Sequence, residues 1–211
     1  MLVTAGKFVG QTRLHYNWKE INSMTAQNTK PLLGCFEICL FMAQGLKRFS
    51  REASSARWSF LLPLLTLPLI VASAIMLSSG YSAVLLAGLH GLRLVLGFAL
   101  FLAVVYLFCR HYERTDRFNR FICAYNWFHI PMFVLTVPML FLMGFGFATT
   151  GEIASYALFI ALLGYIYTGF IICHSLKIPW EMAAFIAIVC MAINQTMLDL
   201  LVFVRDTIAV I

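Results

Sequence analysis

The feature that most constrains this sequence is a succession of long apolar segments separated by short polar ones. They lie at about residues 58–78, within 83–109, and at about 125–147, 153–173 and 180–204. Each is close to the roughly 20 apolar residues that an α-helix needs to cross a bilayer core. The chain is only 11% charged, whereas soluble domains carry about 25% charged residues. The sequence therefore predicts an all-α, polytopic integral membrane protein with five transmembrane helices.

The distribution of polar residues divides the chain into four parts. Residues 1–30 form a polar N-terminal arm, in which Met24 is an alternative start. Residues 31–57 are amphipathic and basic, and Pro31 to Phe49 is expected to form a short helix in the membrane interface. The alternative for that helix is a frayed lead-in to the first span. Residues 58–204 form the five-helix transmembrane domain, and 205–211 form a short tail.

Lysine and arginine alternate between the two ends of the predicted spans. Of the 15 such residues, eight precede residue 58 and four lie in the loop 110–121, while the turns 79–82 and 149–152 contain none. Cytoplasmic loops of membrane proteins carry an excess of these residues. We therefore expect a cytoplasmic N-terminus, a C-terminus on the opposite side, and a bacterial inner membrane as the location. Because the basic residues flank apolar runs, the net charge of +6 does not indicate nucleic-acid binding.

Two charged residues are predicted to lie at membrane depth, Arg93 in the second span and Asp199 in the fifth. Such charges are costly and usually find a partner inside the protein. The topology places both toward the outer side, and Gln195 shares a helix face with Asp199. The functional interpretation is a substrate or proton site. The structural interpretation is a clamp, or two residues that reach separately toward the interface.

The fifth span also carries a stripe of small residues that ends in a polar one. Its members are Ala183, Ala187, Cys190 and Asn194. Small residues let membrane helices approach closely, and an amide can hydrogen-bond across such an interface. The stripe predicts helix packing. Gly97, on the Arg93 face of the second span, would likewise admit a neighbouring helix.

The second predicted loop, residues 110–121, alternates arginines with aromatic side chains. The arginines are Arg110, Arg114, Arg117 and Arg120. A cluster of this kind attracts anionic lipid headgroups or docks a partner. The alternative is that the loop serves only to set the topology.

No known catalytic fingerprint occurs in the chain, so we do not expect an enzyme. The cysteines form no closely spaced pair of the kind that binds metals, and no cofactor is expected. His90 and His129 are the candidates for a haem ligand. His129 stands among aromatic residues, however, as is typical of an interfacial belt.

The order of these parts resembles the Yip1 domain family. An apolar and basic lead-in, FEICLFMAQGLKRFSRE, precedes a proline-containing first span, and FNRFICAYNWFHIPMFV begins the third. The fourth and fifth spans are joined by a short linker in GYIYTGFIICHSLKIPWEMAAFIAI. The resemblance covers about residues 33–204 and implies five spans with a cytoplasmic N-terminus. Bacterial members of this type have no agreed activity, so it implies architecture rather than function.

Three functional hypotheses follow. The first is a non-enzymatic scaffold, accessory or assembly subunit of a larger membrane complex, with lipids, including anionic ones, and other membrane subunits as partners. The second is a small transporter or channel subunit that uses Arg93, Asp199 and Gln195. The third is a haem-binding redox subunit. A cavity that reaches the intramembrane polar residues would favour the second, and a dry surface covered by a partner or lipid would favour the first.

Overall fold

The computed structural model describes residues 30–77, 82–147 and 149–209, so the N-terminal arm and the first turn lie outside the described residues. Within these ranges, helix is the only regular secondary structure. The elements are α2 (Pro31–Cys39), η1 (Ala43–Arg48), α3 (Ala53–Ser59), α4 (Leu61–Leu77), α5 (Ala83–His111), η2 (Thr115–Arg117), α6 (Phe118–Gly144), α7 (Thr150–Leu176) and α8 (Trp180–Ala209).

Four helices of the described residues, α5 to α8, are long and apolar enough to cross a membrane. This confirms the prediction of an all-helical membrane protein. The first predicted span corresponds to α4, which has 17 residues in the structure and begins only after the chain bends at Phe60. It contains Pro68, and neighbouring helices in a membrane can compensate for the hydrogen bond that a proline removes.

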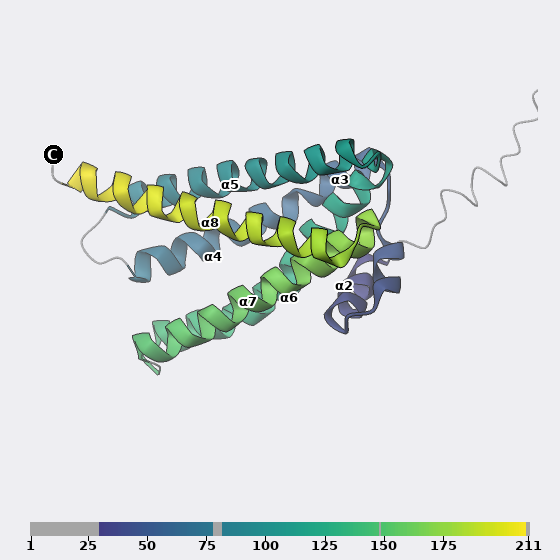
Figure 1. Ribbon diagram of the computed structural model, residues 1–211. Helices are drawn as coiled ribbons and strands as arrows, with labels where there is room; N and C mark the ends of the chain where they lie inside the picture. The colour runs from purple at the N-terminus through teal and green to yellow at the C-terminus, as the bar shows by residue number, and fades with distance from the viewer. Residues whose placement is uncertain (1–29, 78–81, 148, 210–211) are drawn as a thin grey trace, which may run out of the picture.

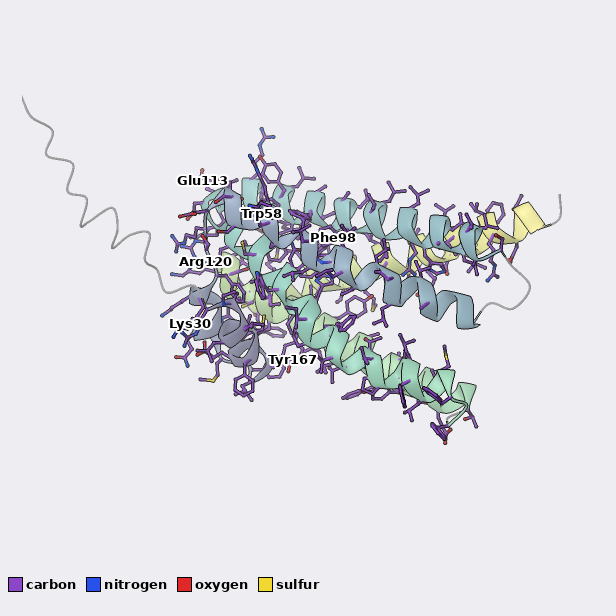
Figure 2. The ribbon with its side chains drawn as sticks, turned by 180° about the vertical axis from the view of Figure 1, so that it is seen from behind. Lys30, Trp58, Phe98, Glu113, Arg120 and Tyr167 are labelled. Carbon is purple, nitrogen blue, oxygen red and sulfur yellow. The ribbon has the colours of Figure 1, made fainter. Side chains whose placement is uncertain are left out.

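The long helices are arranged as two diverging pairs. In Figure 1, α5 and α8 lie side by side, as do α6 and α7, and the pairs meet near α2 and α3 and separate toward the C-terminal end of α8. Figure 2 shows the same divergence from behind. Helices α7 and α8 also pack on each other near the point where the pairs meet, and α4 packs on both α5 and α6. We call the end that carries α2, η1 and α3 the cap end.

The segment before the first span differs from the single helix predicted for Pro31 to Phe49. Helix α2 ends at Cys39, and the chain turns back through Phe41 at a φ of 55° before η1 begins. The turn brings Gly34 and Gly45 so close that a Cβ on Gly45 would lie 2.6 Å from the Gly34 carbonyl oxygen. Two glycines are thus needed where α2 and η1 cross, a requirement that helical periodicity does not reveal.

The cap, α2 with η1 and α3, is packed onto the helical bundle. Ile38 is fully buried, and the Tyr167 hydroxyl donates a hydrogen bond of 2.7 Å to the carbonyl of Cys39. The Phe41 ring stacks on Tyr167 with ring centroids 4.6 Å apart. Burial raises the pKa of the Cys35 thiol to about 12. This thiol therefore stays neutral and donates to the carbonyl of Trp127 at 3.4 Å.

Three long helices begin at positions that the sequence explains to different degrees. Helix α6 begins at Phe118, inside the predicted charged loop. The prediction placed the start of this span later, because hydropathy marks only the apolar part of a helix and not its solvated first turn. Thr149 and Glu152 form a reciprocal capping box at the start of α7. Helix α8 begins at Trp180, directly after Pro179, as expected for a residue that cannot donate a backbone hydrogen bond.

Candidate functional site

Two adjoining cavities lie where the two helix pairs meet. The first, of about 230 Å³, is bordered by α5, α6, α7 and α8. The second, of about 270 Å³, is bordered by α6, α7 and α8. They share the side chains of Tyr125, His129, Tyr165, Cys190 and Asn194. We call them the central cavities.

Arg93 is the charged residue of this site. It lies ten residues into the 29-residue helix α5, about 15 Å along the helix axis from its beginning, and lines the first central cavity. Its Nε atom is buried and has no hydrogen-bond partner. Among the described residues, no acidic side chain forms an ion pair with it. Within the described residues, the cavity is thus bordered by a half-buried cation without a counter-charge.

The remaining polar groups of the site come from three other helices. Asn194 of α8 donates a hydrogen bond of 3.2 Å to the hydroxyl of Tyr165 on α7, and Arg93 and Tyr165 line the same cavity. His129 of α6 has its Nδ1 atom 3.1 Å from the carbonyl oxygen of Tyr125. Because a carbonyl only accepts, Nδ1 carries the proton, which leaves Nε2 as an acceptor. The site thus presents a guanidinium, a hydroxyl and an imidazole within a lining that is partly aromatic and partly aliphatic.

The structure does not bring Arg93 and Asp199 together. Asp199 is exposed on α8 and accepts a hydrogen bond of 2.9 Å from Gln195, one turn earlier on the same helix. Neither Asp199 nor Gln195 lines a central cavity. Helices α5 and α8 do pack along each other, and a Cβ on Gly97 would lie 3.8 Å from Met197. The helices are therefore neighbours, but their relative rotation directs the two charges to different surroundings.

The small-residue stripe of α8 faces α7. Ala183, Ala187 and Cys190 are buried, and a Cβ on Gly169 would contact Ala187 at 3.7 Å. Asn194, the polar end of the stripe, is exposed and bonds to α7 through Tyr165. The stripe therefore leads from a tight interface at the cap end into the central cavities.

The four arginines predicted to bind lipid or a partner separate into different surroundings. Arg114 borders a small hollow beside Leu176 and Ile178, at the end of α7, while Arg110 is exposed at the end of α5. Arg117 and Arg120 lie near each other, and Arg120 also lies near Arg51 of the cap. Among the described residues, the buried Nε atoms of Arg117 and Arg120 have no hydrogen-bond partner, although Arg117 Nε lies 3.7 Å from a carboxylate oxygen of Asp116.

The two histidines considered for haem do not share a cavity. His129 borders both central cavities, whereas His90 borders neither and lies near Arg93 and Arg205. Among the described residues, no group of three or more His, Cys, Asp or Glu side chains is placed to hold a metal ion.

Tyr125 and Tyr165 are the site residues that the sequence did not single out. Aromatic side chains are common in membrane helices, and neither tyrosine belongs to a recognisable motif. A weak signal exists in the chain, since Asn194 needs a hydrogen-bonding partner at membrane depth. Identifying Tyr165 as that partner requires the rotation of α7 against α8, which only the tertiary packing fixes.

Comparison of the chain with protein-family models, curated protein sequences and solved structures finds no match to any of them. The resemblance to the Yip1 domain family therefore stays a prediction.

Proposed function

We propose that this chain is a non-enzymatic membrane protein that binds a small organic anion in the central cavities, as a small transporter does. The observation that carries the proposal is the Arg93 guanidinium, which borders a cavity and forms no ion pair with any acidic side chain that the structure describes. A buried charge that is not paired within a protein costs free energy, and an anion in the cavity would remove that cost. Of the predicted transporter residues, Arg93 remains in this proposal and Asp199 and Gln195 do not.

The size and lining of the cavities define the ligand class. Their volumes, about 230 and 270 Å³, are at or below the lower end of the range of about 300–1,000 Å³ typical of small-molecule sites. Phe98, Phe101, Tyr125 and Phe128 contribute aromatic surface to them. A compact aromatic carboxylate fits both properties, since its ring would contact these side chains and its carboxylate would accept hydrogen bonds from Arg93.

The proposed setting is a five-span arrangement with the cap end in the cytoplasm. Helix α4 runs away from the cap end and α5 returns to it, which supports α4 as an additional span. The cap end also carries Lys30 and Arg120, labelled in Figure 2, as the positive-inside rule requires for a cytoplasmic face. The bacterial inner membrane and membership of the Yip1 domain family belong to the same proposal.

Benzoate tests the binding proposal, with the uncharged benzyl alcohol as the matched probe. Benzoate should raise the melting temperature of the full chain in detergent, and benzyl alcohol should do so much less. Arg93→Gln should abolish the benzoate effect, while Arg57→Gln, on the exposed surface of α3, should retain it. Equal stabilisation by both probes, or an unchanged response of Arg93→Gln, would refute the anion site.

Transport is tested separately from binding. Proteoliposomes that contain the wild-type chain should accumulate labelled benzoate faster than empty liposomes and faster than liposomes with Arg93→Gln. Binding without uptake would restrict the function to a ligand-binding subunit. That result would favour the hypothesis that the chain is an accessory subunit of a larger membrane complex.

One observation favours an accessory role as a second candidate. Gln195 and Asp199 expose polar groups on the outer surface of α8, where contact with lipid is costly. A neighbouring membrane subunit would shield this surface. Gln195→Leu and Asp199→Leu should then release a subunit that co-purifies with the wild-type chain, whereas Arg93→Gln should retain it.

A further inference from the structure

A separate groove of about 680 Å³ lies at the cap end, between the cap and helices α4 and α6. Its rim includes Ser50, Ser54 and Ser55, and its wall includes Trp58, Leu61 and Leu65. We call it the serine groove. It shares no lining residue with the central cavities.

The polarity of the serine groove changes in one direction along the chain. Ser54 and Trp58 of α3 and Leu61 and Leu65 of α4 all line the groove, so the two helices present one continuous surface to it. Hydroxyl groups lie nearest the cap end, a tryptophan follows, and leucines continue toward the bilayer.

The apolar part of this face is not covered by the protein. Trp58 is 72% exposed, Leu61 49% and Leu65 71%. In a bilayer such a face contacts acyl chains, and tryptophan marks the depth at which headgroups begin. The order of hydroxyl, tryptophan and leucine is that of a phospholipid lying along the helix, from headgroup to acyl chain.

The polar end of the groove has an excess of positive charge. Arg51 directly follows Ser50 at the rim, is exposed, and accepts a hydrogen bond from Asn119 of α6 at its backbone carbonyl. Arg120 lies near Arg51, and its buried Nε has no hydrogen-bond partner among the described residues. The two arginines thus adjoin the groove without lining it. Arg48 does line the groove, but its guanidinium is bound to Glu37. The exposed carboxylate of Glu52 accepts a hydrogen bond of 3.3 Å from Ser54 at this rim. Among the described residues, neither Arg51 nor Arg120 forms an ion pair.

We propose that the serine groove binds one anionic phospholipid of the leaflet at the cap end. Its phosphate accepts hydrogen bonds from Arg51, Arg120 and the hydroxyls of the rim, and one acyl chain lies along Trp58, Leu61 and Leu65. Arginine suits this role because its planar donors match phosphate oxygens. The recognised chemistry is a phosphate ester, and the apolar wall selects the form that carries an acyl chain. The proposal is independent of the anion site at Arg93.

Native mass spectrometry of the full chain, released from nanodiscs of phosphatidylglycerol and phosphatidylcholine, tests the headgroup contact. Wild-type protein should retain one phosphatidylglycerol in preference to phosphatidylcholine. The double variant Arg51→Gln/Arg120→Gln should lose about tenfold or more of this retention. The matched double variant Arg110→Gln/Arg114→Gln removes the same charge outside the groove and should retain the lipid. Equal retention of both lipids, or equal loss in the two double variants, would overturn the proposal.

A second pair of variants tests the acyl-chain contact. Leu65→Trp fills the apolar wall of the groove, whereas Leu64→Trp places the same side chain on an equally accessible position outside it. Only Leu65→Trp should reduce retention of phosphatidylglycerol. Glycerol 3-phosphate should compete weakly, because it lacks the acyl chain. Full displacement by glycerol 3-phosphate together with an unaffected Leu65→Trp would show a site for free phosphate esters and overturn the lipid assignment.

Discussion

The guanidinium of Arg48 donates two hydrogen bonds to the carboxylate of Glu37, from Nε to Oε2 at 2.7 Å and from Nη2 to Oε1 at 2.5 Å. The pair joins the end of η1 to the last turn of α2 across the turn at Phe41. Because the same turn brings Gly34 against Gly45, the ion pair and the glycine contact stabilise one local structure. The cap of the bundle therefore depends on residues that lie outside every predicted span.

The ion pair predicts a pH dependence of the cap. Hydrogen bonding to Arg48 holds the pKa of Glu37 below its ordinary value of 4.5. A carboxylate whose pKa is lower in the folded state stabilises the fold above its unfolded pKa and loses that contribution as the pH falls through the folded value. Proteolysis of the cap should therefore accelerate in the wild type as the pH falls below 4.5, the ordinary pKa of the group. Glu37→Gln should be susceptible already at pH 7, and Glu52→Gln should behave as the wild type.

The glycine contact predicts a large effect from one methyl group. Gly45→Ala would place its Cβ 2.6 Å from the Gly34 carbonyl and 2.8 Å from Glu37 Cβ. Backbone does not move as easily as a side chain, so we expect a loss of about 1–3 kcal/mol in the stability of the cap. Gly91→Ala on α5, where nothing lies within 4 Å, is the control and should be neutral or slightly stabilising. Equal melting temperatures of the two variants would contradict the contact.

A buried hydrogen bond fixes α3 to α6. Asn126 Nδ2 donates to the Ser59 hydroxyl at 2.8 Å, and this hydroxyl donates in turn to the Ala56 carbonyl at 2.7 Å. Ser59→Ala would leave the Asn126 amide without a partner, at a cost of about 1–3 kcal/mol. Adding Asn126→Leu should restore part of that loss. A double-mutant cycle measures the coupling, and strict additivity would show that the bond contributes nothing.

The separation of Arg93 from Asp199 predicts additive effects. Arg93 borders a central cavity, whereas Asp199 is bound to Gln195 on the exposed side of α8. Arg93→Leu and Asp199→Leu should therefore combine to within about 0.5 kcal/mol of the sum of the single effects. A recovery of stability in the double variant would instead support the direct pair expected from the sequence.

The proposed orientation predicts a labelling pattern. In a variant without cysteines, Gly151→Cys at the exposed start of α7 should react with a membrane-impermeant maleimide added to intact cells. Thr115→Cys, exposed in η2 at the cap end, should react only after the membrane is opened. The reverse pattern would place the cap end outside and contradict the positive-inside argument.

The location of four of the predicted spans followed from the sequence, because hydrophobic length is a property of a continuous segment. The start of α8 after Pro179 was also predicted, because a proline restricts the backbone only of itself and its sequence neighbours, which the sequence shows directly. The cap was predicted less well. Periodicity indicated one helix from Pro31 to Phe49, but the crossing at Gly34 and Gly45 depends on residues eleven positions apart that meet only through a turn.

The candidate site shows the same division. The sequence by itself determined that Arg93 is a charge at membrane depth that requires a partner, because the cost of burying it depends on the segment around it. The tertiary structure alone decided that Tyr165, Asn194 and His129 surround it and that Asp199 does not. That choice depends on the rotation of each helix about its own axis. All four long helices carry apolar residues around most of their circumference, so the apolar pattern does not determine how each helix is rotated about its axis. Tertiary contacts, such as Gly97 against Met197 and Gly169 against Ala187, determine this rotation.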